Sequence, residues 1–485
     1  MEFTLNLDLP GDGASGGLAS RLYQELRKSV LEGRLSAGEK LPSSRDLAIS
    51  LAVSRNTVSD AYDRLAREGY FEARRGSGTF VQRGLETGHS SRPTPVEFAS
   101  ISQWARRLSA SRSVVPGREL VYDFRPGLPD LRIFPIEIWR RLTARNLRVL
   151  SNAVGPYGDS AGQPRLRAAI ARYLSHSRAV RCDGGDVFIC NGSQQALDLL
   201  GRILIEPGTR VAIEDPGYTP AVAVFRAMRA DIVDVPVDGD GLVVDKIPDR
   251  VKLIYVTPSH QFPLGVTLSL ARRKALLTWA ERHDAVIIED DYDSEFRFGG
   301  RPMESLQGLD RSGRVVYLGT FSKVLFPGLR LGYVVAPQWL QEPFAAAKWI
   351  TDRHTSALEQ AVMTDFIGEG HFGRHLRRMQ RVYGERQQAL IDSLERWASG
   401  YLTIFPSHAG LHMSARLANG IDASELIRRA DEAGVGIYST ASFHRRRAGA
   451  ALIFGYGSCP VEDIREGIRR LGALLRSMEP MTDFR

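Results

Sequence analysis

A lysine lies between hydroxyl groups and an arginine in the stretch GTFSKVLFPGLRLG, residues 319–332. Thr320 and Ser322 lie just before Lys323, and Arg330 follows seven residues later. Hydroxyl groups can donate to a phosphate, and an arginine can pair with one. A desolvated lysine loses its proton readily, and its neutral amine can form an imine with an aldehyde. Taken alone, such a lysine is more often a solvated surface group, so its neighbours must support the chemical interpretation.

Carboxylates follow an apolar run in the stretch VIIEDDYDSEF, residues 286–296. Asp290 comes after Glu289, and Tyr292 lies two residues further on. A carboxylate at a strand end most often caps a helix or forms a salt bridge. It can also hold the N–H group of a pyridinium ring, which keeps that ring protonated and electron-withdrawing.

Other polar groups also follow apolar runs. ICNGSQQALDLL places Ser193 and Gln194 between a strand and a helix, where free N–H groups and the helix dipole favour a phosphate. Tyr218 in EDPGYTP can stack on a flat ring or pack on the core. TPSHQFPLG supplies His260 and Gln261, which are candidate donors to a phenolic oxygen.

The elements that must position these groups are predicted by alternation along the chain. Apolar runs alternate with helical stretches, and the runs are DVFICNG, RVAIED, KLIYVTP, AVIIEDD and RVVYLGTFS. This pattern predicts an α/β domain with a mainly parallel sheet, which binds ligands at the carboxyl ends of its strands. From about Ala346 the chain is helix-rich and then strand-like, which predicts a smaller α/β subdomain.

The first eighty residues have a different organisation. An apolar residue recurs every four positions at Leu18, Leu22, Leu26 and Val30, which predicts a helix. Ser43 and Ser54 are predicted N-caps of two further helices, and Gly69 ends the last of them. YFEARRGSGTFV predicts two strands around a glycine turn. The order is that of a winged helix-turn-helix, which places its third helix in the major groove of DNA.

The predicted third helix opens with groups suited to DNA. Arg55 and Asn56 can read base edges, whereas Ser54 and Thr57 can hold phosphates. The wing adds two arginines and a glycine, Arg74, Arg75 and Gly76. A helical protein-interaction domain with solvated arginines is the alternative that the pattern alone leaves open.

Bulk composition permits this interpretation and excludes others. The chain has 485 residues and a net charge of +8, which permits nucleic-acid binding. Its three cysteines have no spacing typical of a disulfide framework or zinc site, so we expect reduced thiols and no metal site. We find no signal peptide and no run of eighteen apolar residues, and we expect a cytoplasmic protein without a membrane span.

Two resemblances sharpen these expectations. LPSSRDLAISLAVSRNTVSDAYDRLAREGYFEARRGSGTFV resembles the GntR family of bacterial DNA-binding domains over its whole length. The resemblance implies that the DNA contacts include Arg45, Arg55, Asn56 and Gly76. The second resemblance covers roughly residues 123–475 and is carried by YGDSAGQPRLR, EDPGY, TPSHQFPLG, IIEDDYDSEF and SKVLFPGLRLG. In this order they resemble the fold-type I pyridoxal phosphate (PLP) enzymes of the aminotransferase class.

The second resemblance implies a role for each candidate. Lys323 forms the imine with PLP and Asp290 pairs with the pyridine nitrogen. Tyr218 stacks on the ring, and the contacts to the ring hydroxyl come from Tyr292 with His260 or Gln261. The implied phosphate contacts are Ser193, Gln194, Thr320, Ser322 and Arg330, and Tyr157 before a helix reaches the phosphate of a neighbouring subunit.

Together the two halves resemble the MocR/GabR subfamily of bacterial transcription regulators. We expect a DNA-binding domain at residues 15–83, a linker at 84–118 and a PLP-binding effector domain at 119–480. The resemblance implies a domain-swapped, head-to-tail homodimer whose two heads read paired half-sites. It also implies a sensor of an amino compound, taurine or another amine, or of PLP itself. We expect the aminotransferase-like fold to serve sensing and not turnover, with room for residual half-transamination. The alternatives are an active aminotransferase with an appended DNA-binding domain and a degenerate body that only dimerises.

One departure from the aminotransferase pattern bears on the effector. The late strand AGAALIFGYGS has apolar residues at 452–454, where a carboxylate-binding arginine is expected. GYTP has Pro220 where the GABA-responsive regulators have a second arginine. We therefore expect an effector without an α-carboxylate, one bound by Arg297 or Arg445, or PLP alone, and we favour taurine or another amine over GABA.

Overall fold

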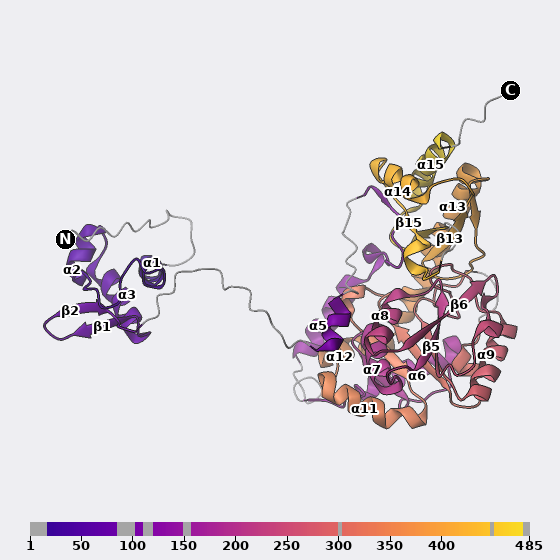
Figure 1. Ribbon diagram of the computed structural model, residues 1–485, viewed down its shortest axis with the longest axis horizontal. Coiled ribbons are helices and arrows are strands. Elements are labelled where there is room, and N and C mark those ends of the chain that lie inside the picture. Colours follow the sequence, from indigo (N-terminus) through magenta and orange to yellow (C-terminus); the bar gives the residue numbers. More distant parts are fainter. Residues whose placement is uncertain are drawn as a thin grey trace. The chain divides into compact units, whose positions relative to one another are not determined.

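The computed structural model describes residues 17–84, 102–109, 120–148, 157–298, 303–446 and 451–478. Contacts divide the chain into two compact units, Met1–Ile101 and Ser102–Arg485, and Figure 1 shows the elements of each. Most of the predicted linker lies outside the described residues. Its described part is helix α4, Gln103–Ser109, which belongs to the second unit, where Arg107 donates to the carbonyl oxygen of Ala227.

The first unit is a winged helix-turn-helix, as predicted. Its elements are α1 (Leu18–Leu31), α2 (Ser44–Ser50), α3 (Arg55–Arg67), β1 (Phe71–Arg74) and β2 (Gly78–Val81). The strands β1 and β2 pair antiparallel. The four-residue apolar period of α1 forms part of a core that also takes in α3, and that core includes Leu22, Leu26, Val30, Val58 and Leu65.

Both predicted N-caps of this unit are present. The Ser43 side chain accepts a hydrogen bond from the backbone N–H of Asp46 at the start of α2. The Ser54 side chain accepts one from Thr57 at the start of α3. Each cap satisfies a helix N–H group that has no partner within the helix.

The second unit contains an eight-stranded, mainly parallel sheet in the order β4-β11-β10-β9-β8-β5-β6-β7. Its strands are β4 (Val187–Cys190), β5 (Arg210–Asp215), β6 (Asp231–Asp238), β7 (Gly241–Leu242), β8 (Leu253–Val256), β9 (Val286–Asp291), β10 (Val315–Thr320) and β11 (Gly332–Val335). β11 runs antiparallel to both neighbours, and β7 runs antiparallel to β6. The five predicted strands are β4, β5, β8, β9 and β10.

Helices enclose both faces of this sheet because alternate strand residues point to opposite sides. Ile288 and Val316 pack in a core with residues of α7, α8 and α11, whereas Ile287 and Tyr317 lie in cores on the other face. The helices of this part are α5 (Ile136–Arg148), α6 (Pro164–Arg178), α7 (Ser193–Leu204), α8 (Thr219–Ala227), α9 (Leu270–His283), α10 (Leu306–Leu309), α11 (Gln338–Asp352) and α12 (Ala357–Gly368).

The later part of the chain forms the predicted smaller subdomain. Its four-stranded antiparallel sheet has the order β12-β13-β16-β15, and β14 pairs in parallel with β3. The strands are β3 (Tyr122–Asp123), β12 (Leu402–Ile404), β13 (His412–Leu417), β14 (Val435–Gly436), β15 (Tyr438–Ser439) and β16 (Ala451–Gly455). The helices are α13 (His371–Ala398), α14 (Ala423–Glu432) and α15 (Val461–Ser477). None of the helices among the described residues is long and apolar enough to cross a membrane.

Candidate functional site

A cavity of about 200 Å³ lies where the carboxyl ends of the central strands approach the smaller subdomain. Residues that follow β4, β5, β8, β9 and β10 line one side. Gly127 and His412 line it from segments far away in the sequence. The predicted residues that line the cavity are Ser193, Gln194, Tyr218, Asp290, Tyr292, Thr320, Ser322, Lys323 and Arg330.

One end of the cavity is built to receive an anion. Helix α7 begins there at Ser193, and no side chain caps its N-terminus. The hydroxyl of Thr320 lies 3.1 Å from that of Ser322, and the Arg330 guanidinium lies 2.8 Å from the carbonyl oxygen of Asn191. Uncapped helix N–H groups, hydroxyls and a guanidinium are all donors that suit a phosphate.

Gly192 permits the close approach of Arg330 to this helix start. Its φ is +79°, and a Cβ atom added there would lie 2.9 Å from the Arg330 guanidinium. A side chain at this position would therefore displace the arginine from the phosphate-suited end. The glycine is thus part of the site although it contributes no functional group.

Asp290 has one carboxylate oxygen engaged and the other free. Its Oδ2 accepts a 2.6 Å hydrogen bond from the hydroxyl of Tyr255. Its Oδ1 is buried without a hydrogen-bond partner among the described residues. Burial raises the pKa of this carboxyl to about 6, while the hydrogen bond from Tyr255 lowers it. A buried acceptor without a partner on the cavity wall fits the N–H group of a bound ring.

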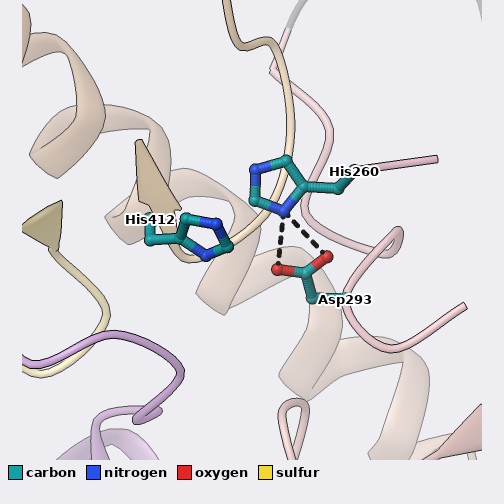
Figure 2. A group of neighbouring side chains, drawn as sticks. All are labelled: His260, Asp293 and His412. Carbon is teal, nitrogen blue, oxygen red and sulfur yellow. Dashed lines mark hydrogen bonds and ion pairs between the residues drawn. The ribbon is translucent and has the colours of Figure 1, made fainter. Parts of the chain in front are cut away.

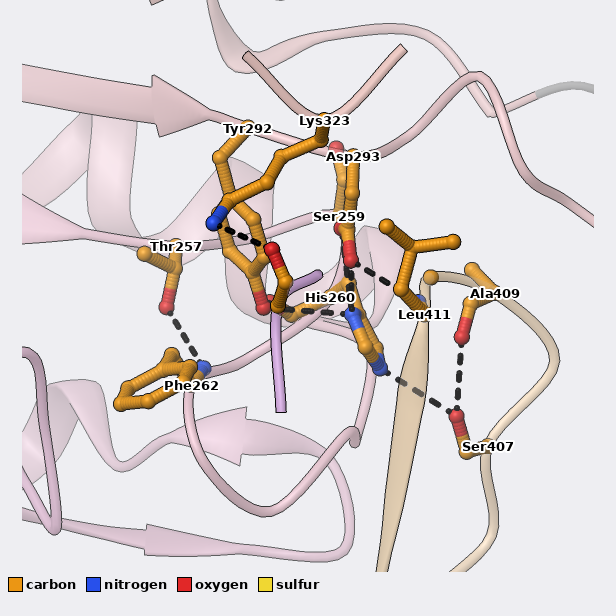
Figure 3. Close-up of polar contacts among 12 residues, drawn as sticks. Thr257, Ser259, His260, Phe262, Tyr292, Asp293, Lys323, Ser407, Ala409 and Leu411 are labelled. Carbon is orange, nitrogen blue, oxygen red and sulfur yellow. Dashed lines mark hydrogen bonds and ion pairs between the residues drawn. The ribbon is translucent and has the colours of Figure 1, made fainter. Parts of the chain in front are cut away.

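Lys323 is held by a backbone carbonyl across the cavity. Its Nζ donates a 2.8 Å hydrogen bond to the carbonyl oxygen of Gly127 (Figure 3 shows Lys323 beside Tyr292 and Asp293). Burial lowers the pKa of this amine, and the carboxylates of Asp293 and Asp290 partly offset that effect. The amine is therefore more readily available in its neutral, nucleophilic form than a surface lysine.

Aromatic side chains form the wall between these two ends. The ring of Tyr218 lies 5.8 Å from that of Phe262 in an edge-to-face arrangement. The hydroxyl of Tyr292 donates a 2.8 Å hydrogen bond to the carbonyl oxygen of His260. Tyr218 and Phe262 line the same cavity as Asp290 and Lys323, so a flat ring held between Asp290 and Lys323 would share the cavity with both aromatic side chains.

Three predicted cofactor-binding residues do not line this cavity. The ring of His260 bonds through Nδ1 to Asp293, and the residue holds Tyr292 through its backbone. The side-chain amide nitrogen of Gln261 donates to the backbone oxygens of Pro216 and Phe262, at 2.8 and 2.7 Å. Tyr157 is 83% exposed. Its predicted contact with a second subunit stays a prediction.

Of the three residues predicted at the ring hydroxyl, Tyr292 alone lines the described cavity. His260 is placed one layer behind it, because its Nδ1 is turned to a buried carboxylate. Gln261 has no donor left, because a primary amide carries two N–H groups and both are used. The choice between these two residues as ring-hydroxyl partners therefore has no support from their side-chain geometry.

Sequence reasoning missed several residues of the wall, namely Gly127, Tyr255, Thr257, Phe262 and His412. Tyr255 had a usable signal, since it is a polar aromatic residue within the fully buried run LIYV. Gly127 and His412 had none, because each is brought to the cavity by a long-range contact.

The late strand contributes no cation to this wall. Residues 452–454 of β16 are buried and apolar, as the sequence indicated. Arg445 is paired with Asp234 and the carbonyl oxygen of Glu214, and neither Arg445 nor Arg297 lines the cavity. Among the described lining residues, the cationic side chains are Lys323 and Arg330.

The predicted DNA contacts divide into two groups. Arg45, Arg55, Asn56, Arg75 and Gly76 are exposed. The others have structural partners within the first unit: Ser54 and Thr57 bond each other at the start of α3, and Arg74 pairs with Glu72 at 2.9 Å. The exposed group is accessible to a nucleic acid, and Ser54 is exposed too although its hydroxyl caps α3.

The sequence matches two family models. Residues 18–81 match "Bacterial regulatory proteins, gntR family", and residues 131–450 match "Aminotransferase class I and II". The crystal structure of LysN, an α-aminoadipate aminotransferase from Thermus thermophilus complexed with N-(5'-phosphopyridoxyl)-L-leucine, is similar to 78% of this chain and 97% of its own. Its TM-score is 0.70 and its sequence identity 33%.

Curated regulators are similar to most of this chain, and the match to one of them spans both units. The probable rhizopine catabolism regulatory protein MocR of Rhizobium meliloti is 40% identical over 95% of this chain and 94% of its own. The HTH-type pyridoxine biosynthesis transcriptional regulator PdxR of Corynebacterium glutamicum is 33% identical over 81% of this chain and 82% of its own. The chain therefore belongs to the MocR/GabR subfamily of GntR-type transcription regulators, in which a winged helix-turn-helix is joined to an aminotransferase class I and II domain.

Proposed function

We propose that this regulator binds PLP in the cavity of its second unit and uses it to sense an amino compound or PLP itself. The observation that carries the proposal is the free Oδ1 of Asp290 and the buried amine of Lys323 on one cavity wall, with phosphate donors at its end. These groups fit the ring nitrogen, the aldehyde and the phosphate of one molecule.

The phosphate end would be held by this chain's fixed donors. Ser193, Gln194, Thr320, Ser322 and Arg330 would hold the phosphate oxygens, together with the uncapped start of α7. The helix dipole and the guanidinium both favour a dianion. These contacts would fix the position of the ligand before any group reaches Lys323.

The ring end would be held by Asp290, Tyr292 and Tyr218. Asp290 would accept the ring N–H through Oδ1, while Tyr255 keeps Oδ2 occupied. The Tyr292 hydroxyl, which donates to the His260 carbonyl, would accept a hydrogen bond from the hydroxyl of the ring, and Tyr218 would stack on the ring face. When bound, PLP supplies an aldehyde that reacts with primary amines and a ring that withdraws electrons.

Lys323 would compete with an incoming amine for that aldehyde. Its depressed pKa keeps part of the amine neutral, and Gly127 accepts its N–H. An amine that replaces Lys323 would release this side chain from the cavity wall. Such a change can favour one conformation of the unit, provided that the amine binds the two conformations with different affinity.

The regulatory output would be a change in how the first unit binds DNA in the cytoplasm. A domain-swapped, head-to-tail homodimer would present two winged helices to paired half-sites of an operator. The names of the similar proteins do not identify the effector of this chain, because one relative is named for rhizopine catabolism and another for pyridoxine biosynthesis. PLP alone and an amine are therefore both candidate effectors.

An active aminotransferase with an appended DNA-binding domain is the second candidate. Its support is the retention of Lys323, Asp290 and Arg330 on one wall and the likeness to LysN. An enzyme of this kind would turn over repeatedly with an amino donor and a keto acid. A regulator would complete at most a half-reaction and would change its DNA binding.

The decisive experiment combines an absorption titration with DNA binding. Wild type and Lys323→Ala are loaded with PLP, and the absorption band of the lysine–PLP adduct is recorded before and after addition of GABA, taurine and neutral amines. We expect a band that depends on Lys323 and an amine, or PLP itself, that changes operator affinity. Absence of the band in the wild type would overturn the proposal, and sustained turnover without any effect on DNA binding would favour the enzyme.

A further inference from the structure

His412 presents an unused imidazole to the cavity. It begins β13 in the smaller subdomain and lines the wall, yet it is only 1% exposed. Neither ring nitrogen has a hydrogen-bond partner of regular geometry among the described residues, although the backbone of Pro263 lies close enough to raise the pKa of the ring. Buried polar side chains nearly always have such a partner, so this residue lacks one that a ligand in the cavity can supply.

The neighbours of His412 hold its ring in place without satisfying it. Its ring lies 4.4 Å from that of His260. Figure 2 shows the two rings together with Asp293. Nδ1 of His260 is 3.0 and 3.1 Å from the two carboxylate oxygens of Asp293, and its Nε2 is 3.4 Å from the Ser407 hydroxyl. Asp293 also accepts a bond from the backbone of Leu411. Both ring nitrogens of His260 thus have partners, whereas His412 has at most the backbone of Pro263 and keeps at least one ring nitrogen for a ligand.

The chemistry that His412 offers is that of an uncharged group. Burial, and next the neighbouring His260, hold the pKa of its imidazole well below the usual range. A neutral imidazole has one N–H donor and one acceptor nitrogen. The two nitrogens point away from each other, so a ligand hydroxyl meets one of them, and it can either donate to the acceptor nitrogen or accept from the N–H. A carboxylate or sulfonate only accepts and brings a charge that needs a cation.

The cavity has no described cation to spare for such a charge. Arg330 lies at the phosphate-suited end, and Lys323 is committed to the aldehyde under the proposed function. The position expected to hold a carboxylate-binding arginine is occupied by the apolar run at 452–454. There Ile453 is paired with Ser414 and Tyr438 inside the sheet.

We propose that the effector is an amine carrying an uncharged hydroxyl group, and that His412 binds this hydroxyl. The proposal rests on the proposed function, since the amine end is taken to react at the PLP-binding wall. It assigns His412 as a specificity-determining residue and narrows the effector class to amino alcohols and amino polyols.

The test uses amines that share a two- or three-carbon chain and differ at the far end. PLP-loaded protein is titrated with 2-aminoethanol, 3-amino-1,2-propanediol, taurine and β-alanine, and both the adduct spectrum and the heat of binding are recorded. We expect the two hydroxyl-bearing amines to bind at least tenfold more tightly than the two anions. A tighter response to taurine or β-alanine, or no response to any amine, would overturn the proposal.

Variants of His412 separate recognition from folding. His412→Leu removes both hydrogen-bonding atoms and should weaken amino alcohol binding about tenfold, because one hydrogen bond between neutral groups is lost. His412→Asn keeps a donor and an acceptor and should restore part of that affinity. The adduct band should form in all three proteins, and PLP affinity should change less than amino alcohol affinity. Equal amino alcohol affinity in His412→Leu and wild type would overturn the role of His412.

The spectra separate failure of this proposal from failure of the proposed function. Absence of the adduct band in wild type would sink both proposals, whereas a normal band that prefers an anionic amine would sink this one alone. The ligand atoms of His260, Asp293 and His412 lie within 4.8 Å of one another, which would suit a divalent metal. Metal analysis that found a stoichiometric divalent ion lost in His412→Leu would also overturn the hydroxyl assignment.

Discussion

The hydroxyl of Tyr255 donates a 2.6 Å hydrogen bond to Oδ2 of Asp290, and both groups are buried. A second pair of the same kind lies one residue further along β9, where Tyr317 donates a 2.6 Å bond to Oδ2 of Asp291. The first pair lines the cavity and the second does not. Asp291 is instead paired with Arg178 at 2.8 Å. The two pairs thus separate the effect of a buried phenol–carboxylate bond from an effect on ligand binding.

Tyr255→Phe is expected to weaken PLP binding by roughly ten- to a hundredfold, since a hydrogen bond to a charged group contributes about 1.5–3 kcal/mol. Without the phenol, Asp290 holds its proton to higher pH and pairs less well with a ring N–H. Titration with PLP gives the dissociation constant. Tyr317→Phe is the matched control, because it should lower thermal stability and leave PLP affinity nearly unchanged. Equal losses of affinity in both variants would contradict the assigned role of Asp290.

The pH dependence of PLP binding should also report Asp290. The raised pKa of about 6 means that the carboxylate is present above that pH and is protonated as the pH falls through it. In Lys323→Ala binding is noncovalent, and loss of the lysine charge, which lowers the pKa of Asp290, moves that pKa above its wild-type value. Affinity should therefore fall as the pH drops through the shifted pKa. Asp290→Asn in the same background is neutral at every pH, so its remaining pH dependence belongs to PLP itself. The advantage of Asp290 over Asn should shrink as the pH falls through the Asp290 pKa, and a constant ratio of the two affinities would contradict the prediction.

The parts of the fold that could be predicted are those with a local pattern. The central strands were evident as apolar runs, and both N-caps of the first unit as a serine before an apolar face. β6 and β11 were not predicted. Asp231–Asp238 carries acidic residues and lies half-exposed near the sheet edge. Gly332–Val335 is only four residues long and comes directly after the lysine motif.

The candidate site divides in the same way. Asp290 and Lys323 follow strands, so the strand-end rule and their order placed them together. His260 and Gln261 looked suitable as donors, but the partners that use those donors lie elsewhere in the fold. His412 is 89 residues beyond Lys323, and only the packing of the smaller subdomain against the sheet brings it to the cavity.

Gly127→Ala is expected to reduce the band of the lysine–PLP adduct. The φ of Gly127 is +77°, and an added Cβ would lie 2.9 Å from Nζ of Lys323. The amine would have to leave its position at the carbonyl oxygen. Gly208→Ala is the matched control, because Gly208 has a φ of +89° and nothing within 4 Å of an added Cβ. Both variants carry backbone strain of about 1–2 kcal/mol, but only Gly127→Ala should change the spectrum. An unaltered band in Gly127→Ala would show that Lys323 does not depend on this glycine.

Arg55→Ala should weaken binding to an operator selected with the full-length protein by about ten- to a hundredfold, since a side chain that reads a base edge contributes about 1–3 kcal/mol. Arg55 is the first residue of α3 and is exposed, as the docking geometry of this motif requires. Arg67→Ala removes the same charge from the last residue of the same helix, where the side chain is also exposed and bonds to the carbonyl oxygen of Asp63. Fluorescence anisotropy at several salt concentrations distinguishes the two. A general loss of positive charge would weaken both variants alike, whereas a base contact weakens Arg55→Ala on the operator more than on unrelated DNA.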